Sequence, residues 1–205
     1  MVNKIKEIFI PIVPDISGED ECVNPEKINA ESCDCCGFKS LYLWNGFRSA
    51  HSSSHAVCTL CYLTGHLDSP TALHGRIIWL PELSAQSAIH LQRQSILAWN
   101  FGNKVQRKIG KRIYLYLIRH SREVEYVFGS SRGVDFSEAI KRIPLGKRNL
   151  IYEKLRECTL LLPPDVFKAP NLLLAKYKTT EQQLTSYSYK TYKRSDLYAE
   201  PYSLD

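Results

Sequence analysis

Four cysteines in this sequence have the type and spacing that bind a metal ion. They form two C-x-x-C pairs, Cys33 with Cys36 and Cys58 with Cys61. A C-x-x-C turn directs two thiolates at one centre, and two such turns complete a tetrahedron around zinc. Gly37 follows the first pair and supplies the small residue that a tight turn needs. We therefore predict one structural Zn²⁺ ion held by these four thiolates.

The other three cysteines fit this site less well. Cys35 lies inside the first pair and could compete as a ligand, but the two-residue spacing favours Cys33 with Cys36. Cys22 and Cys158 are isolated, as cysteines that fill a core usually are. The alternatives for the two pairs are ordinary buried thiols or disulfides. Two matched pairs in a chain that we expect to be cytosolic argue against both.

Three histidines near the second pair raise the question of a catalytic metal. Four thiolates saturate a tetrahedral zinc ion and leave no open position for water, so we interpret His51, His55 and His66 as exposed loop residues. An enzyme with a reactive thiol such as Cys35 would need a Cys–His pair at dyad spacing, which we do not find. The sequence predicts no catalytic residue, and we expect that the protein is not an enzyme.

Short elements in the first half must position the cysteines. A β-prone run at 41–44 follows the first pair, and a Ser- and His-rich linker at 49–55 precedes the second. A second β-prone run at 76–80 ends at Pro81. Residues 1–30 contain several Pro and Gly and predict an N-terminal arm, either extended or an edge strand.

The second half predicts mainly helices. Ser84 can cap a helix that runs to about Asn100 and stops at Gly102. Within it, residues 92–94 (Gln, Arg, Gln) interrupt the apolar stripe, so we expect one face to pack and the other to stay in solvent.

Four further segments complete the predicted organisation. We favour one helix over 104–128, a helix that Asp135 caps and that ends at Pro144, and helices at 148–158 and 170–184. Residues 185–205 are rich in Tyr, Ser, Lys and Thr and predict a flexible tail. The domains are thus an arm at 1–30, a zinc-containing domain with a helical extension at 31–184, and the tail.

Composition fits a globular chain. The 205 residues suit one domain, or one domain and a tail, and they are 44% hydrophobic and 23% charged. The apolar run at 8–14 contains two prolines and is too short for a membrane anchor, so we expect a cytosolic protein. The net charge of +6 favours acidic proteins, nucleic acid or an anionic membrane surface as partners. No phosphate loop or dinucleotide fingerprint occurs.

Several motifs beyond the cysteine pairs occur in a fixed order. They are C-x-x-C-G-F at 33–38, C-x-x-C at 58–61, Ile-Trp-Leu-Pro-Glu-Leu at 78–83, Glu-Lys-Leu at 153–155 and Leu-Leu-Pro at 161–163. Together they resemble the IcmJ/DotN family of type IVB (Dot/Icm) secretion systems, over about residues 33–176. The cysteine pairs alone are common, and the Leu-Pro-Glu-Leu element in register is more specific.

The resemblance implies an α+β fold with a zinc-bound ββα core, similar to HNH endonucleases and treble-clef proteins, and several added helices. It also implies a non-catalytic adaptor in the coupling complex that recruits substrates for secretion or plasmid conjugation. The implied partners are the C-terminal extension of the coupling ATPase and other coupling subunits. The implied location is the cytoplasmic face of the bacterial inner membrane, reached only through the ATPase, with nucleic acid not expected as a partner.

The alternative is a nucleic-acid-binding zinc protein or an HNH-type nuclease. Its motivation is the positive charge, especially the basic residues at 104–119. A nuclease of this type needs a histidine base beside an open divalent metal. The strand after the first pair contains no Asp-His pair, and the position after Cys61 is Tyr62. We therefore interpret the nuclease site as absent.

Overall fold

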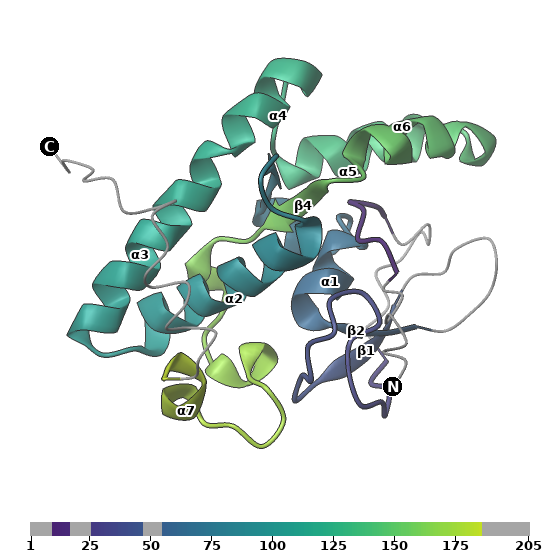
Figure 1. Cartoon of the computed structure of the whole chain (residues 1–205). Coiled ribbons are helices and arrows are strands. Elements are labelled where there is room, and N and C mark those ends of the chain that lie inside the picture. The colour runs from purple at the N-terminus through teal and green to yellow at the C-terminus, as the bar shows by residue number, and fades with distance from the viewer. Residues whose placement is uncertain (1–9, 17–25, 47–54, 186–205) are drawn as a thin grey trace, which may run out of the picture.

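The structure is a computed structural model that describes residues 10–16, 26–46 and 55–185 (Figure 1). The fold is mixed α+β with two small antiparallel sheets, which confirms the α+β part of the predicted class. In chain order the elements are β1 (Leu43–Gly46), β2 (His55–Cys58), α1 (Thr59–Thr64), β3 (Arg76–Trp79), α2 (Ala85–Phe101), α3 (Lys104–Arg119), α4 (Ser121–Phe128), α5 (Gly133–Arg142), α6 (Arg148–Leu155), β4 (Cys158–Leu161) and α7 (Thr180–Leu184). Short 3-10 turns lie at Ala72–His74, Leu145–Lys147, Pro164–Val166 and Pro170–Leu173.

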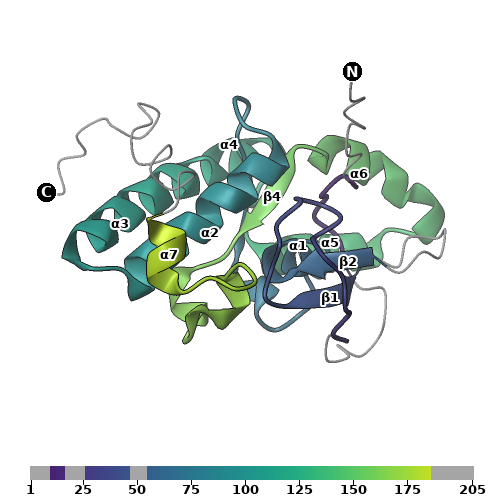
Figure 2. The same ribbon diagram turned by 60° about the horizontal axis from the view of Figure 1, so that its bottom comes forward.

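Two ends of the molecule differ in their architecture. Figures 1 and 2 show β1, β2 and α1 on one side, α3 on the other, and α2 between them. We call residues 26–46 and 55–67 the metal end, and the group formed by α2, α3, α4, β3 and β4 the helical end. One core surrounds the cysteines and reaches α2, and a second, smaller core lies between α2, α3 and the β3–β4 sheet.

The first sheet belongs to the metal end. β1 pairs with β2, with Leu43 opposite Cys58, and α1 follows β2 without a break. Neither β2 nor α1 was predicted from its own residues, since the Ser- and His-rich composition at 49–55 indicated a linker; a second strand and a helix were implied only by the resemblance. That linker lies outside the described residues except for His55, which begins β2.

The second sheet joins distant parts of the chain. The predicted run at 76–80 is confirmed as β3, which pairs with β4 so that Ile77 lies opposite Leu160. The helix predicted over 148–158 is wrong at its end, since α6 stops at Leu155 and Cys158 begins β4. All four residues of β4 are buried, which explains why they adopt the strand rather than extend the helix.

Helix α2 was predicted correctly in its bounds and wrongly in its faces. Ser84 accepts a hydrogen bond from the Ser87 N–H at 3.2 Å, and Gly102 ends the helix, as expected. However, the polar residues at 92–94 are buried, not solvated. The reason is that α2 lies between the two cores, with Ile89 in the larger and Leu91 in the smaller.

Gln92 uses its buried side chain to bind β4. Its Nε2 donates to the Leu160 carbonyl at 2.8 Å, and its Oε1 accepts from the Leu162 N–H at 2.8 Å. On β3, the Ile77 N–H donates to the Ser131 carbonyl at 2.6 Å and the Trp79 N–H to the His120 carbonyl at 3.2 Å. Both strands therefore bond to groups outside the sheet.

Three further predictions need correction. The single helix expected over 104–128 is two helices that meet at His120. Asp135 does not cap α5, because the helix begins earlier, at Gly133. Asp135 lies in the first turn, where a negative charge is favourable, and its carboxylate accepts a hydrogen bond from the Ser130 hydroxyl. The helix expected over 170–184 is only the 3-10 turn Pro170–Leu173 and the short α7.

The chain termini are only partly described. Residues 10–16 form no strand; they are an extended segment whose Ile12 is buried and whose Asp15 N–H donates to the Thr64 carbonyl at 3.0 Å. Cys22, His51 and the tail at 186–205 lie outside the described residues. The proposed boundaries at 30 and 184 stay predictions. Among the described helices, none is both long and apolar enough to cross a membrane.

Candidate metal centre

The first cysteine pair lies on a tight turn, the knuckle. The Gly37 N–H donates to the Cys33 carbonyl at 2.8 Å, and the Cys33 N–H donates to the Phe38 carbonyl at 3.0 Å. Gly37 has φ of 68°, a left-handed conformation that favours glycine, as its place after the pair predicted. The turn therefore holds the two thiols on one side.

The second pair is positioned by the β1–β2 hairpin. Cys58 is the last residue of β2 and the N-cap of α1, and Cys61 lies in the first turn of that helix. Asp34 joins the hairpin to the knuckle, because its N–H donates to the Ala56 carbonyl and its Oδ2 accepts from the Ala56 N–H, both at 2.8 Å. The knuckle and the helix start thus face each other.

The four sulfur atoms converge as a metal site requires. The Sγ atoms of Cys33, Cys36, Cys58 and Cys61 all lie within 4.8 Å of one another, and all four residues are buried. The Cys36–Cys58 and Cys58–Cys61 Sγ distances are 3.7 and 3.5 Å. A disulfide needs about 2.05 Å, whereas a tetrahedron with Zn–S bonds of about 2.3 Å separates the sulfurs by about 3.8 Å. The cluster has no disulfide and fits a tetrathiolate metal ion.

Arg93 of α2 lies against this cluster, and sequence reasoning assigned it to a solvated face. Its side chain is 1% exposed, and its Nη2 donates to Cys58 Sγ at 3.0 Å and approaches Cys36 Sγ at 3.9 Å. The guanidinium also stacks on the Phe38 ring at 3.7 Å from its centroid. A divalent ion with four thiolates carries a net negative charge, so the buried guanidinium supplies the compensating positive charge.

A second residue that the sequence did not reveal is His90, which holds Arg93 and the knuckle together. Its Nδ1 lies 3.0 Å from Arg93 Nη1, and its Nε2 lies 2.8 Å from the Cys36 carbonyl. Burial and then the charge of Arg93 lower the pKa of His90, so the ring is neutral. In that state Nδ1 accepts from the guanidinium and Nε2–H donates to the carbonyl. The sequence signal for His90 was its position three residues before Arg93, which places both side chains on one face of α2.

The electrostatics of the thiols follow from this environment. Burial raises the pKa of Cys58, but hydrogen bonds from the neighbouring thiols and the charge of Arg93 bring it well below its usual range. Cys35 is fully buried beside the cluster, and hydrogen bonds from Cys33 and Cys61 lower its pKa to about 5. It is not one of the four residues whose sulfurs converge.

Of the three candidate histidines, His55 and His66 are described and neither joins the four converging thiols, whereas His51 lies outside the described residues. His55 begins β2 and lies 3.8 Å from the Asp34 carboxylate, so it is not a loop residue. His66 follows α1, stacks on Tyr62 at 3.9 Å between ring centroids, and has its Nδ1 2.8 Å from the Tyr62 carbonyl. It is half-buried and held, which corrects the expectation of an exposed side chain.

No protein-family model matches this chain, and no curated protein matches it.

Proposed function

We propose that this protein is a non-catalytic adaptor in which a structural Zn²⁺ ion holds a protein-docking scaffold. The observation that carries the non-catalytic part is the closure of the metal centre. The four buried thiols have the spacing of a tetrahedral shell that would leave no open position on a zinc ion, and Arg93 donates to Cys58 at the edge of the cluster. Zinc suits such a centre because it prefers four tetrahedral thiolates and needs no further ligand.

We propose that the core is of the HNH or treble-clef type. The order knuckle, hairpin and helix supports this, with the second cysteine pair at the helix start. A nuclease on such a core would place a histidine base beside an open metal. Tyr62, which follows Cys61, is buried, and the nearest histidine–carboxylate pair, His55 with Asp34, uses the carboxylate to bind the Ala56 N–H.

The resemblance supplies the biological setting of the proposal. We propose a place in the coupling complex of a type IVB secretion or conjugation system, docked on the C-terminal extension of the coupling ATPase beside other coupling subunits. Membrane association would then be indirect, at the cytoplasmic face of the inner membrane through the ATPase.

The test is co-purification with the C-terminal extension of the coupling ATPase encoded in the same gene neighbourhood. We expect a complex at micromolar concentration and about one zinc ion per chain by metal analysis. Cys36→Ser should abolish the complex by unfolding the metal end. The matched control is Cys158→Ser, which changes a buried cysteine of β4 outside the cluster and should keep both zinc and partner. Absence of a complex with the unaltered protein would refute the adaptor role.

One observation favours nucleic-acid binding as a second candidate. Helix α3 contains no acidic residue and exposes a row of basic side chains: Lys104, Arg107, Lys108, Lys111, Arg112 and Arg119. Phosphate binding by such a row would weaken steeply with salt, and Lys108→Glu with Lys111→Glu would abolish it. The same samples, incubated with supercoiled plasmid and Mg²⁺ or Mn²⁺, test for cleavage. We expect intact plasmid.

A further inference from the structure

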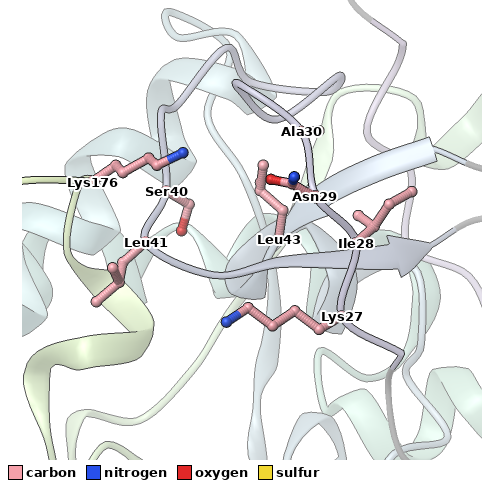
Figure 3. A pocket seen from close by; sticks show the side chains of 8 residues that line it. All are labelled: Lys27, Ile28, Asn29, Ala30, Ser40, Leu41, Leu43 and Lys176. Atoms are coloured by element: carbon pink, nitrogen blue, oxygen red, sulfur yellow. The ribbon is translucent and has the colours of Figure 1, made fainter.

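A cavity of about 390 Å³ lies between the metal end and Lys176 in the described part of the chain. Its lining residues come from three segments: Lys27, Ile28, Asn29 and Ala30; Ser40, Leu41 and Leu43; and Lys176. Figure 3 shows these side chains around the opening. The volume is within the range of small-ligand sites.

The walls of the cavity are two extended segments that separate. The Ile28 N–H donates to the Leu43 carbonyl at 2.9 Å, which joins the segments at one end. At the other end, the Leu41 N–H turns away and donates to the Leu174 carbonyl at 2.9 Å. Because the segments part between these points, the cavity is an open groove suited to an extended chain.

Two lysines are among the residues that line the groove. Figure 3 shows the Lys176 ammonium near Ser40 and the Lys27 ammonium on the other side of the 41–43 segment. Neither forms an ion pair with a residue that the structure describes; Lys27 lies 4.6 Å from the centroid of the Tyr42 ring. The nearby Glu31 is bound to Lys39 at 2.6 Å. Lys176 lies 5.4 Å from the centroid of the Tyr177 ring, and its charge, after that of Lys39, helps to lower the pKa of Glu31. Because it forms no ion pair with a described residue, its ammonium group can bind a further anion.

Ser40 adds a donor on the Lys176 side of the groove (Figure 3). It is 3% exposed, and its Oγ has no hydrogen-bond partner among the described residues. A buried hydroxyl without a partner is unfavourable, so a ligand that accepts from it gains stability. Rotation about the Cα–Cβ bond breaks no existing hydrogen bond, which lets the hydroxyl turn to an incoming oxygen.

Apolar groups surround these donors. Leu43 is buried in the floor, while Leu41 is 39% exposed at the rim. A ligand that fits must therefore carry one negative group and an aliphatic body. An acidic residue flanked by aliphatic residues in an extended segment has this chemistry.

From this arrangement we infer that the groove binds an acidic, aliphatic segment of a partner protein, with a carboxylate beside Lys176 and Ser40. The inference deepens the adaptor proposal and rests on it for the claim that the ligand belongs to a protein. The walls are the chain just before and just after the knuckle, so the site depends on the metal centre for its shape.

The test is a titration of the zinc-loaded, ¹⁵N-labelled full chain with the blocked tripeptide acetyl-Leu-Glu-Leu-amide, followed by NMR. We expect saturable shift changes at the lining residues with a Kd of about 1 mM. The Gln analogue should bind at least about fivefold more weakly, because it loses the charge-assisted hydrogen bonds. Equal binding of both peptides, or shift changes only elsewhere, would overturn the inference. If acetate bound as tightly as the peptide, the groove would be a site for small carboxylates, and the inference would also be overturned.

Variants locate the contact. Lys176→Gln should weaken tripeptide binding about fivefold, and Ser40→Ala about threefold, since each removes one donor. Ser40→Ala deletes an unpartnered hydroxyl, so the fold should keep its melting temperature. The matched control is Lys178→Gln, which removes the same charge two residues away at an exposed position outside the lining. If Lys178→Gln weakened peptide binding as much as Lys176→Gln, the peptide would be held by general charge attraction, and the site would be refuted.

Co-purification with the ATPase extension separates this inference from the proposal on which it rests. Loss of the complex in Lys176→Gln would support the inference. A complex that forms equally well with Lys176→Gln and the unaltered chain would overturn the inference and leave the adaptor role. Tripeptide binding without any complex of the unaltered chain would overturn the adaptor role and, with it, the assignment of the ligand to this partner.

Discussion

The metal end and the helical end are built from elements of very different length. In the metal end the strands have four residues each and α1 has six. In the helical end α2 has 17 residues and α3 has 16, and they bury aliphatic side chains such as Ile113 and Leu117 between them. Short elements bury little apolar surface within themselves, so a bound metal ion would add to the stability that the surrounding core gives the metal end.

The difference suggests where stability resides in each end. Loss of the metal should affect the first, and loss of close packing should affect the second. Arg93 and His90 connect the ends, since both belong to α2 and contact the knuckle or the thiols. The following predictions test how far the ends are independent.

Metal removal should have the largest effect. Zinc binding by small thiolate sites contributes about 10–16 kcal/mol, comparable to the whole stability of a domain. We expect a chelator, or Cys58→Ser, to remove hydrogen-exchange protection from β1, β2 and α1, while α2 and α3 keep most of their helical circular dichroism. Uniform loss of protection across both ends would show one cooperative unit and contradict the comparison.

Arg93→Met should come next. It removes the buried countercharge of the thiolates and should cost about 3–5 kcal/mol, with weaker zinc binding in competition with a chelating dye. Arg93→Lys should lose less, because the charge remains but the planar fork does not. The matched control is Gln94→Met: Gln94 is also buried, and its Oε1 has no partner among the described residues. If Arg93→Met bound zinc as tightly as the unaltered chain, the guanidinium would have no part in metal binding.

Gly110→Ala should affect only the helical end. A Cβ at this position would lie 2.6 Å from the Trp99 nitrogen and 2.7 Å from the Ser95 carbonyl oxygen, so α2 and α3 would have to separate. We expect a loss of about 1–3 kcal/mol in urea unfolding with zinc content unchanged. Gly146→Ala, where a Cβ meets nothing within 4 Å, is the control and should be close to neutral. A stability of Gly110→Ala equal to that of the control would contradict the close packing.

Ser84→Ala should have the smallest effect. It removes the side chain that caps α2 and should cost about 1 kcal/mol. Ser84→Asp keeps an acceptor at this position and should restore the lost stability in the same thermal unfolding assay. A loss that Asp does not restore would mean that the hydroxyl acts in another way.

The features that the sequence predicted are those set by nearby residues. The spacing of Cys33 with Cys36 and of Cys58 with Cys61 is local, as are the cap at Ser84 and the stop at Gly102, and the structure agrees with each. The run at 76–80 is likewise a strand because its own residues favour one.

The features that were missed depend on contacts between distant residues. Arg93 and Gln92 are polar residues in an amphipathic helix, so the sequence predicts that they face solvent. In the structure the cysteine cluster and β4 cover them. Cys158 continues a helical pattern and becomes a strand only because β3 is available to pair with it. Helix α1 follows a polar stretch and is buried through all of its six residues. Periodicity within one element does not reveal such partners.

The contacts of Gln92 have a consequence for the protein in a crowded cell. A sheet of two strands exposes two rows of peptide groups to which another chain can add a strand, the first step of aggregation. Here the amide of Gln92 occupies peptide groups of one row, at Leu160 and Leu162, and the carbonyls of Ser131 and His120 occupy those of the other. The glutamine that interrupts an apolar stripe thereby protects a short hydrophobic sheet from joining its own copies.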